Sequence, residues 1–231
     1  MAPIKHKTIY LITGANRRLG LSFTKTLLAR DKTVVIAAVR DTLSPSALAM
    51  ADIPRGTDSE IITAKIDSLN AASAASAIAN LPKSVNHLDV VIANAGVHRH
   101  FGPVSAMPIE ELPYHIAVNT AAPIVLLQAC LPLLKHSSSP KFVVVSSTLG
   151  SLAEVDNFPQ NAGAYGASKA AVNYLMRKVH YEEPWLASMV ICPGWTQTDM
   201  GNNGAKQFGF GDSAPLPVDV STKGVIEELA L

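Results

Sequence analysis

The sequence lacks an excess of charge of either sign. Lys and Arg together number 19 and Asp and Glu number 18, which gives a formal net charge of +1. This balance provides no general attraction to nucleic acid or to an anionic membrane, so we expect neither as a partner. Any anion site in the chain must therefore be local.

Cysteine is scarce, and long apolar runs are absent. The two cysteines, Cys130 and Cys192, both stand in apolar stretches, and we expect two buried thiols in a reducing compartment rather than a disulfide framework. No run approaches the ~18 consecutive apolar residues that span a membrane, and MAPIKHKTIY lacks the apolar region of a signal peptide. We therefore expect a cytoplasmic protein.

Six apolar runs of strand length alternate with segments of helical spacing. The runs are rich in Val and Ile, which is typical of strands buried on both faces of a parallel sheet; they cover 8–13, 33–39, 59–66, 88–94, 141–147 and 187–193. Helical spacing occurs over 19–30, 70–81, 108–135 and 163–181. The alternation predicts an α/β fold, a single Rossmann domain over 1–231 with a doubly wound parallel sheet and helices on both faces. Glycine-rich 201–217 predicts a mobile surface loop.

Polar or glycine-containing residues follow every predicted strand. Ligands of open parallel sheets bind beyond the carboxyl ends of the strands, so these strand tips should converge on one cleft. They are TGANRRLG (13–20), Arg40–Asp41, Asp67–Ser68, Asn94–Ala95–Gly96, Ser146–Ser147 and Pro193–Gly194. This convergence is more informative than any single motif.

The first strand tip, TGANRRLG, has the form of a glycine turn that leads into a helix. Gly14 and Gly20 would let the N–H groups of the helix N-terminus hold a pyrophosphate. Arg18 stands where a middle glycine would let a phosphate approach the backbone. The rest of the turn belongs to the same predicted phosphate site: Thr13, Asn16, Arg17 and Leu19.

The residues after the second run indicate which dinucleotide is bound. Arg40 occupies the place where a carboxylate would bind a ribose 2′-hydroxyl and repel a 2′-phosphate. Arg17 supplies a second guanidinium, and such forked donors suit phosphate. The sequence therefore favours NADP(H) over NAD. Asp41 keeps NAD open, and two solvated surface arginines are the alternative interpretation.

Tyr165 and Lys169 are the clearest catalytic candidates. A spacing of four puts both side chains on one helix face, where the ammonium can lower the pKa of the phenol and favour proton exchange with a substrate oxygen. Tyr174 and Lys178 repeat the spacing, but the nine-residue offset turns them about 180° away. Because small residues follow Tyr165, we predict that Tyr165 faces the cleft and that Tyr174 packs among apolar neighbours.

Two further residues complete the predicted proton relay. Ser147 ends the fifth run and could orient a substrate carbonyl, with Ser146 as the alternative if the strand register shifts by one. Pro123 follows Asn119 by four residues and has no N–H to bond the Asn119 carbonyl. We therefore predict a kink in which this free carbonyl holds a water beside Lys169. A bent helix without catalytic meaning is the other interpretation.

His98 and His100, in GVHRHFG, do not indicate a metal site. They lack nearby carboxylate or cysteine partners in the sequence, so we expect no metal and place both histidines at the substrate mouth. A Ser-His-Asp hydrolase is disfavoured because the sequence has no G-x-S-x-G motif.

Taken in order, these motifs resemble those of the short-chain dehydrogenase/reductase family over nearly the whole chain. The matching pieces are TGANRRLG, Asp67, NAG (94–96), Asn119, Ser147, Tyr165–Lys169 as YxxxK, and PGWTQTDM (193–200). PGWTQTDM and AYGASKAAVNYL are most similar to carbonyl reductases, including fungal ketoreductases of the norsolorinic acid ketoreductase type. The resemblance implies an NADP-dependent oxidoreductase acting on the CH–OH group of alcohols.

The resemblance also implies roles for the matching residues. Tyr165 would exchange the proton, Lys169 would bind the nicotinamide ribose and tune the phenol, and Ser147 would position the carbonyl. Asn119 would hold the relay water. Cofactor contacts are implied for Asp67 at the adenine, for the ribose region at Asn94, Ala95 and Gly96, and for the nicotinamide and phosphates at Pro193, Gly194, Thr196 and Thr198.

Two departures from the family pattern bear on function. Arg18 replaces the middle glycine of TGxxxGxG, as in pteridine reductases, and the chain stops at GVIEELAL, so we expect the last edge strand of the sheet to be missing. The prediction is NADPH-dependent reduction of a small ketone or aldehyde, reversible and within secondary metabolism, by a homodimer or homotetramer. The alternatives are a pteridine or enone reductase, or a catalytically weak NADPH-binding regulator.

Overall fold

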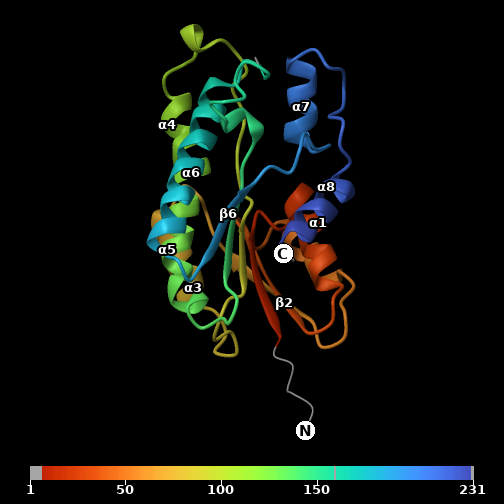
Figure 1. Cartoon of the computed structure of the whole chain (residues 1–231). Helices are drawn as coiled ribbons and strands as arrows, with labels where there is room; N and C mark the ends of the chain where they lie inside the picture. Colours follow the sequence, from red (N-terminus) through yellow and green to blue (C-terminus); the bar gives the residue numbers. More distant parts are fainter. Residues whose placement is uncertain (1–6, 159, 230–231) are drawn as a thin grey trace.

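Six parallel strands form one sheet in the order β3-β2-β1-β4-β5-β6 (Figure 1). The computed structural model describes residues 7–158 and 160–229. The strands are β1 (Thr8–Thr13), β2 (Thr33–Val39), β3 (Glu60–Lys65), β4 (Val90–Ala93), β5 (Lys141–Val145) and β6 (Ala187–Ile191). Because the order reverses between β1 and β4, the crevice for a ligand lies beyond the carboxyl ends of these strands. The predicted doubly wound Rossmann fold is confirmed, and β6 is the last strand in the described residues.

Helices cover both faces of the sheet (Figure 1). One side carries α3 (Ala71–Ala79), α4 (Glu111–Ile116), α5 (Ala122–Leu134) and α6 (Gly163–Glu182). The other side carries α1 (Arg18–Leu28), α7 (Asp199–Gln207) and α8 (Val218–Glu228), and the short α2 (Pro45–Leu48) follows β2. In α1 the buried Leu19, Phe23 and Leu27 recur every four residues, so a single apolar stripe packs on the sheet.

The core consists of two hydrophobic clusters, one on each face of the sheet. Successive residues of a strand point to opposite faces, so Leu11 belongs to the cluster beneath α5 and α6 and Ile12 to the cluster beneath α1 and α8. All seven residues of β2 are buried. The edge strands β3 and β6 are partly exposed, so the expectation that every run is buried on both faces is wrong for these two.

The long predicted helix over 108–135 is divided. A π-helical segment, Ala117–Ala121, separates α4 from α5, and the N–H of Ala122 bonds to the carbonyl of Ala117. Pro123 lacks an N–H, so a wider turn replaces the predicted simple kink. Residues Glu111–Leu134 are long and apolar enough to cross a membrane by length and composition, with a mean hydropathy of 1.7. Here, however, Leu126, Leu127, Cys130 and Leu134 lie in the core.

The mobile loop predicted over 201–217 is wrong for its first part, which belongs to α7. The Thr198 side chain caps this helix by accepting from the Gly201 N–H at 3.0 Å. A Cβ on Gly201 would lie 1.9 Å from the Thr196 carbonyl oxygen, so this glycine permits close packing inside a helix. The glycines of this stretch had predicted flexibility, whereas in the structure Gly201 allows a close contact with the Thr196 backbone.

The two cysteines have different surroundings. Cys130 is fully buried on α5, as predicted, and burial raises the pKa of its thiol to about 12. Cys192 is exposed, so the prediction of a second buried thiol is wrong. It follows the end of the edge strand β6, where no further strand of the described sheet covers it.

Candidate active site

The turn after β1 is built around two glycines that no other residue could replace without strain. Gly14 has a φ of +65°, and a Cβ on Gly20 would lie 2.1 Å from the Gly14 carbonyl oxygen. The Thr13 hydroxyl accepts from the backbone N–H groups of Asn94 and Ala95, each at 3.0 Å. The Asn94 side chain donates back to the Thr13 carbonyl at 2.9 Å. The tips of β1 and β4 are therefore fixed to each other, as the predicted convergence requires.

Arg18 occupies a backbone position that favours glycine. Its φ of +51° lies in the left-handed region, which explains why the family pattern has glycine there. Its Nε donates to Asp199 Oδ2 of α7 at 2.8 Å, and Nη2 reaches the same oxygen. Arg18 is therefore not a free cation at the predicted phosphate site. The Asp199 carboxylate, 181 residues further along the chain, already binds it.

Three guanidinium groups gather at the turn. Burial lowers the pKa of Arg17, the charges of Arg18 and Arg40 lower it further, and Asp199 opposes them. Asn16 donates to Ser46 Oγ at 2.7 Å and so links the turn to α2, next to the tip of β2. Asp199 is a carboxylate that offsets part of this repulsion, and a bound anion would relieve more of it.

Leu19, the remaining residue of the predicted turn, has a structural role. Leu19 is a buried residue of α1 and belongs to the cluster on that face of the sheet. It contributes packing that holds the helix N-terminus against the strands rather than a polar group that could contact a ligand.

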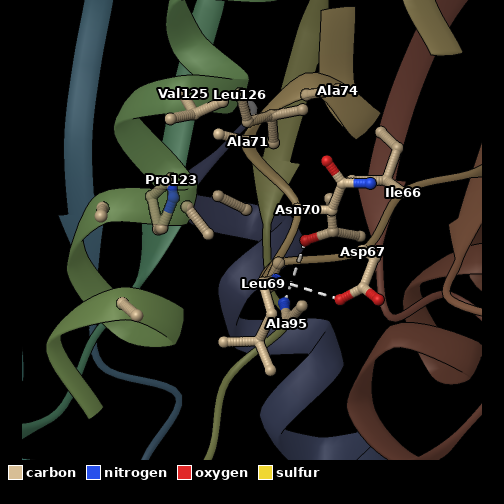
Figure 2. Close-up of a pocket in the computed structure, with 16 residues that line it drawn as sticks. Ile66, Asp67, Leu69, Asn70, Ala71, Ala74, Ala95, Pro123, Val125 and Leu126 are labelled. Carbon is tan, nitrogen blue, oxygen red and sulfur yellow. Dashed lines mark hydrogen bonds between the residues drawn. The ribbon is translucent and has the colours of Figure 1, made fainter. Parts of the chain in front are cut away.

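A cavity of about 180 Å³ lies between the carboxyl ends of the strands and α5 (Figure 2). Thr13, Asp67 and Ala95 reach it from β1, β3 and β4, and Pro123 closes it from α5. The Asp67 carboxylate accepts from the Leu69 N–H at 3.0 Å, which fixes it at the wall. The cavity thus combines one oriented carboxylate with apolar walls, as a flat heteroaromatic base requires.

Tyr165 and Lys169 lie one turn apart near the start of α6. Lys169 is only 4% exposed, and its Nζ donates to the Val145 carbonyl at 2.7 Å and stands 5.7 Å from the centre of the Tyr165 ring. Burial lowers the pKa of Lys169 to about 8. Tyr174, from the competing pair, is 68% exposed, so the prediction that it packs among apolar neighbours is wrong.

Burial controls the acidity of Tyr165 in this structure. It raises the pKa of the phenol to about 12, while a hydrogen bond with the Ser147 side chain acts in the opposite direction. The prediction that Lys169 lowers the pKa of Tyr165 is therefore wrong for this structure. A positive charge added nearby would be needed to favour the phenolate.

The serine that faces Tyr165 is the second of the pair. Ser146 is buried and its Oγ donates to Asn173 Oδ1 at 2.6 Å, so its hydroxyl is engaged away from the cleft. Ser147 is instead the serine whose side chain acts on the Tyr165 phenol and lowers its pKa. A Cβ on Gly150 would lie 2.6 Å from Lys169 Cβ, so glycine lets the segment after β5 pass close to α6.

Asn119 is completely buried and joins three segments through its side chain. Its Oδ1 accepts from the Val97 N–H at 2.8 Å, and its Nδ2 donates to the Val97 carbonyl at 2.9 Å and to Ser168 Oγ at 3.0 Å. A Cβ on Gly96 would lie 3.2 Å from Asn119 Oδ1 and 3.7 Å from Lys169 Nζ. The backbone carbonyl of Asn119 was predicted to act, whereas the side-chain amide could not be predicted because its partners lie 22 and 49 residues away.

The segment after β6 is held by hydroxyl groups. Gly194 has a φ of +76°, and Thr196 Oγ1 lies 3.1 Å from the Pro193 carbonyl oxygen, to which it donates. Thr196 is buried, and Thr198 caps α7. The four predicted cofactor contacts are therefore held in place by hydrogen bonds beside the sheet; they are Pro193, Gly194, Thr196 and Thr198.

A series of aromatic rings begins at Tyr165. His98 stacks on it with ring centres 4.3 Å apart, Phe101 lies 4.1 Å from His98, and Phe208 lies 5.4 Å from Phe101. Trp195 lies 6.3 Å from Phe208. His98 was predicted near the substrate. Trp195 and Phe208 were not, because rings a hundred residues apart form no local pattern.

A parallel sheet that reverses at a glycine turn, with a tyrosine and a buried lysine beside it, defines a nucleotide-dependent oxidoreductase of the Rossmann type. More particularly, the chain belongs to the short chain dehydrogenase family, whose sequence profile matches residues 8–208. The predicted family resemblance is confirmed.

Two fungal enzymes are among the similar proteins. Norsolorinic acid ketoreductase stcE of Emericella nidulans is 37% identical over 222 residues, which cover 95% of this chain and 84% of that enzyme. Norsolorinic acid ketoreductase nor1 of Dothistroma septosporum is 38% identical, with coverage of 95% and 83%.

Solved structures of carbonyl reductases share the fold. The NADPH-bound carbonyl reductase from chicken fatty liver has a TM-score of 0.82 at 28% identity, covering 96% of this chain and 90% of that one. The carbonyl reductase Sniffer of D. melanogaster has a TM-score of 0.81 at 28% identity, with coverage of 96% and 91%.

Proposed function

We propose that this protein reduces a ketone or aldehyde to an alcohol with NADPH as the cofactor. The observation that carries the proposal is the meeting of Tyr165, Ser147 and Lys169 at the carboxyl ends of the strands, beside a turn bearing three arginines. The similarity to norsolorinic acid ketoreductases and to an NADPH-bound carbonyl reductase supports it.

The residues at the turn fit a 2′-phosphorylated dinucleotide. Gly20 lets the start of α1 pass close to the Gly14 carbonyl, where a Cβ would clash, and so keeps the helix N–H groups beside the turn to hold a pyrophosphate. Arg17 and Arg40 offer guanidinium groups to the 2′-phosphate. Asp67 would accept from the adenine in the adjoining cavity.

The bound cofactor supplies a hydride to the carbonyl carbon. Ser147 donates a hydrogen bond to the carbonyl oxygen and orients it toward Tyr165, whose hydroxyl gives its proton to that oxygen as charge develops. Lys169 holds the nicotinamide ribose and, as an ammonium, favours loss of the phenolic proton. Asn119 fixes the segment after β4 and holds the water through which that proton is replaced.

A substrate screen tests the proposed activity. We expect purified protein to bind NADPH and to oxidise it, measured by its absorbance, with members of a panel of ketones, aldehydes and quinones. Binding of NADPH, detected by tryptophan quenching, without oxidation by any member of the panel would contradict a reductase.

The ion pair between Arg18 and Asp199 makes a separate prediction about the cofactor. We expect Arg18→Gly to weaken NADPH binding about tenfold, roughly 1.4 kcal/mol, because it uncovers the Asp199 carboxylate beside the phosphates. Thermal stability should change little, since glycine relieves left-handed backbone strain of about 1–2 kcal/mol while an exposed ion pair worth about 0–1 kcal/mol is lost.

The double variant Arg18→Gly, Asp199→Asn separates two explanations of that loss. If the loss comes from the uncovered carboxylate, the double variant regains most of the NADPH affinity in a fluorescence titration. A double variant as weak as Arg18→Gly would mean instead that Arg18 itself is a phosphate ligand.

A further inference from the structure

His98 has a buried nitrogen that the mechanism does not use. The ring stacks on Tyr165 at an interplanar angle of 12° and packs on Phe101, so it forms the wall beside the reacting hydroxyl. Its Nε2 is shielded from solvent and has no hydrogen-bond partner among the residues that the structure describes. A buried polar atom without a partner costs free energy, so its retention in an active site calls for a functional reason.

The surroundings of His98 determine what this nitrogen can do. Burial and the charge of His115 lower the pKa of His98 to about 4, so the ring is neutral near pH 7. The backbone of His100 acts in the opposite direction and raises this pKa. In the neutral tautomer that carries its proton on Nδ1, Nε2 is a hydrogen-bond acceptor.

We propose that His98 Nε2 accepts a hydrogen bond from a hydroxyl group of the substrate and thereby selects hydroxylated aromatic ketones. The inference rests on the proposed reductase function and adds a specificity-determining residue to it. The selection of an aromatic ketone follows from the rings of Phe101, Phe208 and Trp195, which line the same wall. Nε2 is shielded from solvent, so water competes little with a hydrogen bond formed there.

Binding is measured apart from turnover, with acetophenone and its 2′-, 3′- and 4′-hydroxy derivatives as probes. Isothermal titration calorimetry is carried out on the free protein and on its complex with NADP⁺, which has no hydride to transfer. We expect at least one hydroxyacetophenone to bind the wild-type protein about tenfold more tightly than acetophenone, as one well-shielded hydrogen bond would give.

Three variants locate the effect. His98→Phe keeps an aromatic ring against Tyr165 but removes the acceptor, and it should bind all the probes about equally. His98→Gln places an amide oxygen near the position of Nε2 and should recover most of the preference. His180→Phe, at an exposed histidine near the end of α6, should leave the preference unchanged, and thermal melts check that each variant is folded.

The outcomes separate this inference from the proposed function. The role of His98 would be overturned by a wild-type protein that binds none of the probes or does not discriminate among them. A preference that survives in His98→Phe, or one that His180→Phe abolishes, would overturn it as well. If the reductase function alone fails, NADPH is not oxidised although the binding preference depends on His98. If the role of His98 alone fails, NADPH oxidation continues without that preference.

Discussion

Replacement of Tyr165 by phenylalanine should lower kcat for carbonyl reduction by about 10² to 10⁴-fold, the usual contribution of a positioned proton donor. The substitution removes one hydroxyl and keeps the ring that stacks on His98, so the geometry of the wall should persist. Burial raises the pKa of this phenol to about 12, which keeps it protonated at neutral pH and ready to donate. The measurement is NADPH oxidation with the best substrate from the screen.

The matched control is Tyr174→Phe on the same helix. Tyr174 has the same spacing to a lysine but is 68% exposed, so its hydroxyl should be dispensable for activity. NADPH affinity should be similar in both variants, since neither loses a group that contacts the phosphates. Equal turnover in Tyr165→Phe and the wild-type protein would show that another group donates the proton.

Arg40→Asp should shift the preference between cofactors by roughly 10² to 10³-fold in the ratio of kcat/KM for NADPH to that for NADH. The substitution removes a charge-assisted hydrogen bond to the 2′-phosphate, worth about 1.5–3 kcal/mol, and adds a repulsive charge. The new carboxylate could also accept from the ribose 2′-hydroxyl of NADH. Most of the change should therefore appear as lost NADPH activity with NADH activity kept or improved.

Lys83→Asp is the control for the change in net charge. Lys83 stands in the loop before β4, at the amino ends of the strands and away from the turn. It should leave the cofactor ratio unchanged when both variants are assayed at the same ionic strength, because salt screens distant charges. An unchanged ratio in Arg40→Asp would remove Arg40 from the phosphate site and leave Arg17 as the candidate.

The strands could be predicted from the sequence because their signal is local. The run of Val and Ile over 33–39 coincides with β2, and the run over 8–13 with β1. Burial at both faces produces a continuous apolar pattern, which is readable without knowledge of the neighbours. The glycine-containing α7 was missed because Gly201 serves a close contact with Thr196, and such a contact leaves no mark on local composition.

The site was predicted less completely, since much of its chemistry comes from long-range contacts. The pairing of Tyr165 with Lys169 follows from helix spacing alone. The choice of Ser147 over Ser146 required the contact between Ser146 and Asn173. The pKa of Tyr165 was predicted in the wrong direction because its burial depends on elements from the whole chain.

The sequence by itself determined the alternating α/β order, the family, and the residue types placed after each strand, because these depend on periodicity and on neighbours a few positions apart. The tertiary structure alone decided that Asp199 holds Arg18, that the Asn119 amide joins Val97 to Ser168, and that His98 lies on Tyr165. The physical reason is that burial and hydrogen bonding are properties of side chains brought together by the fold. Their strength depends on distance and solvent exclusion, which a linear pattern does not contain.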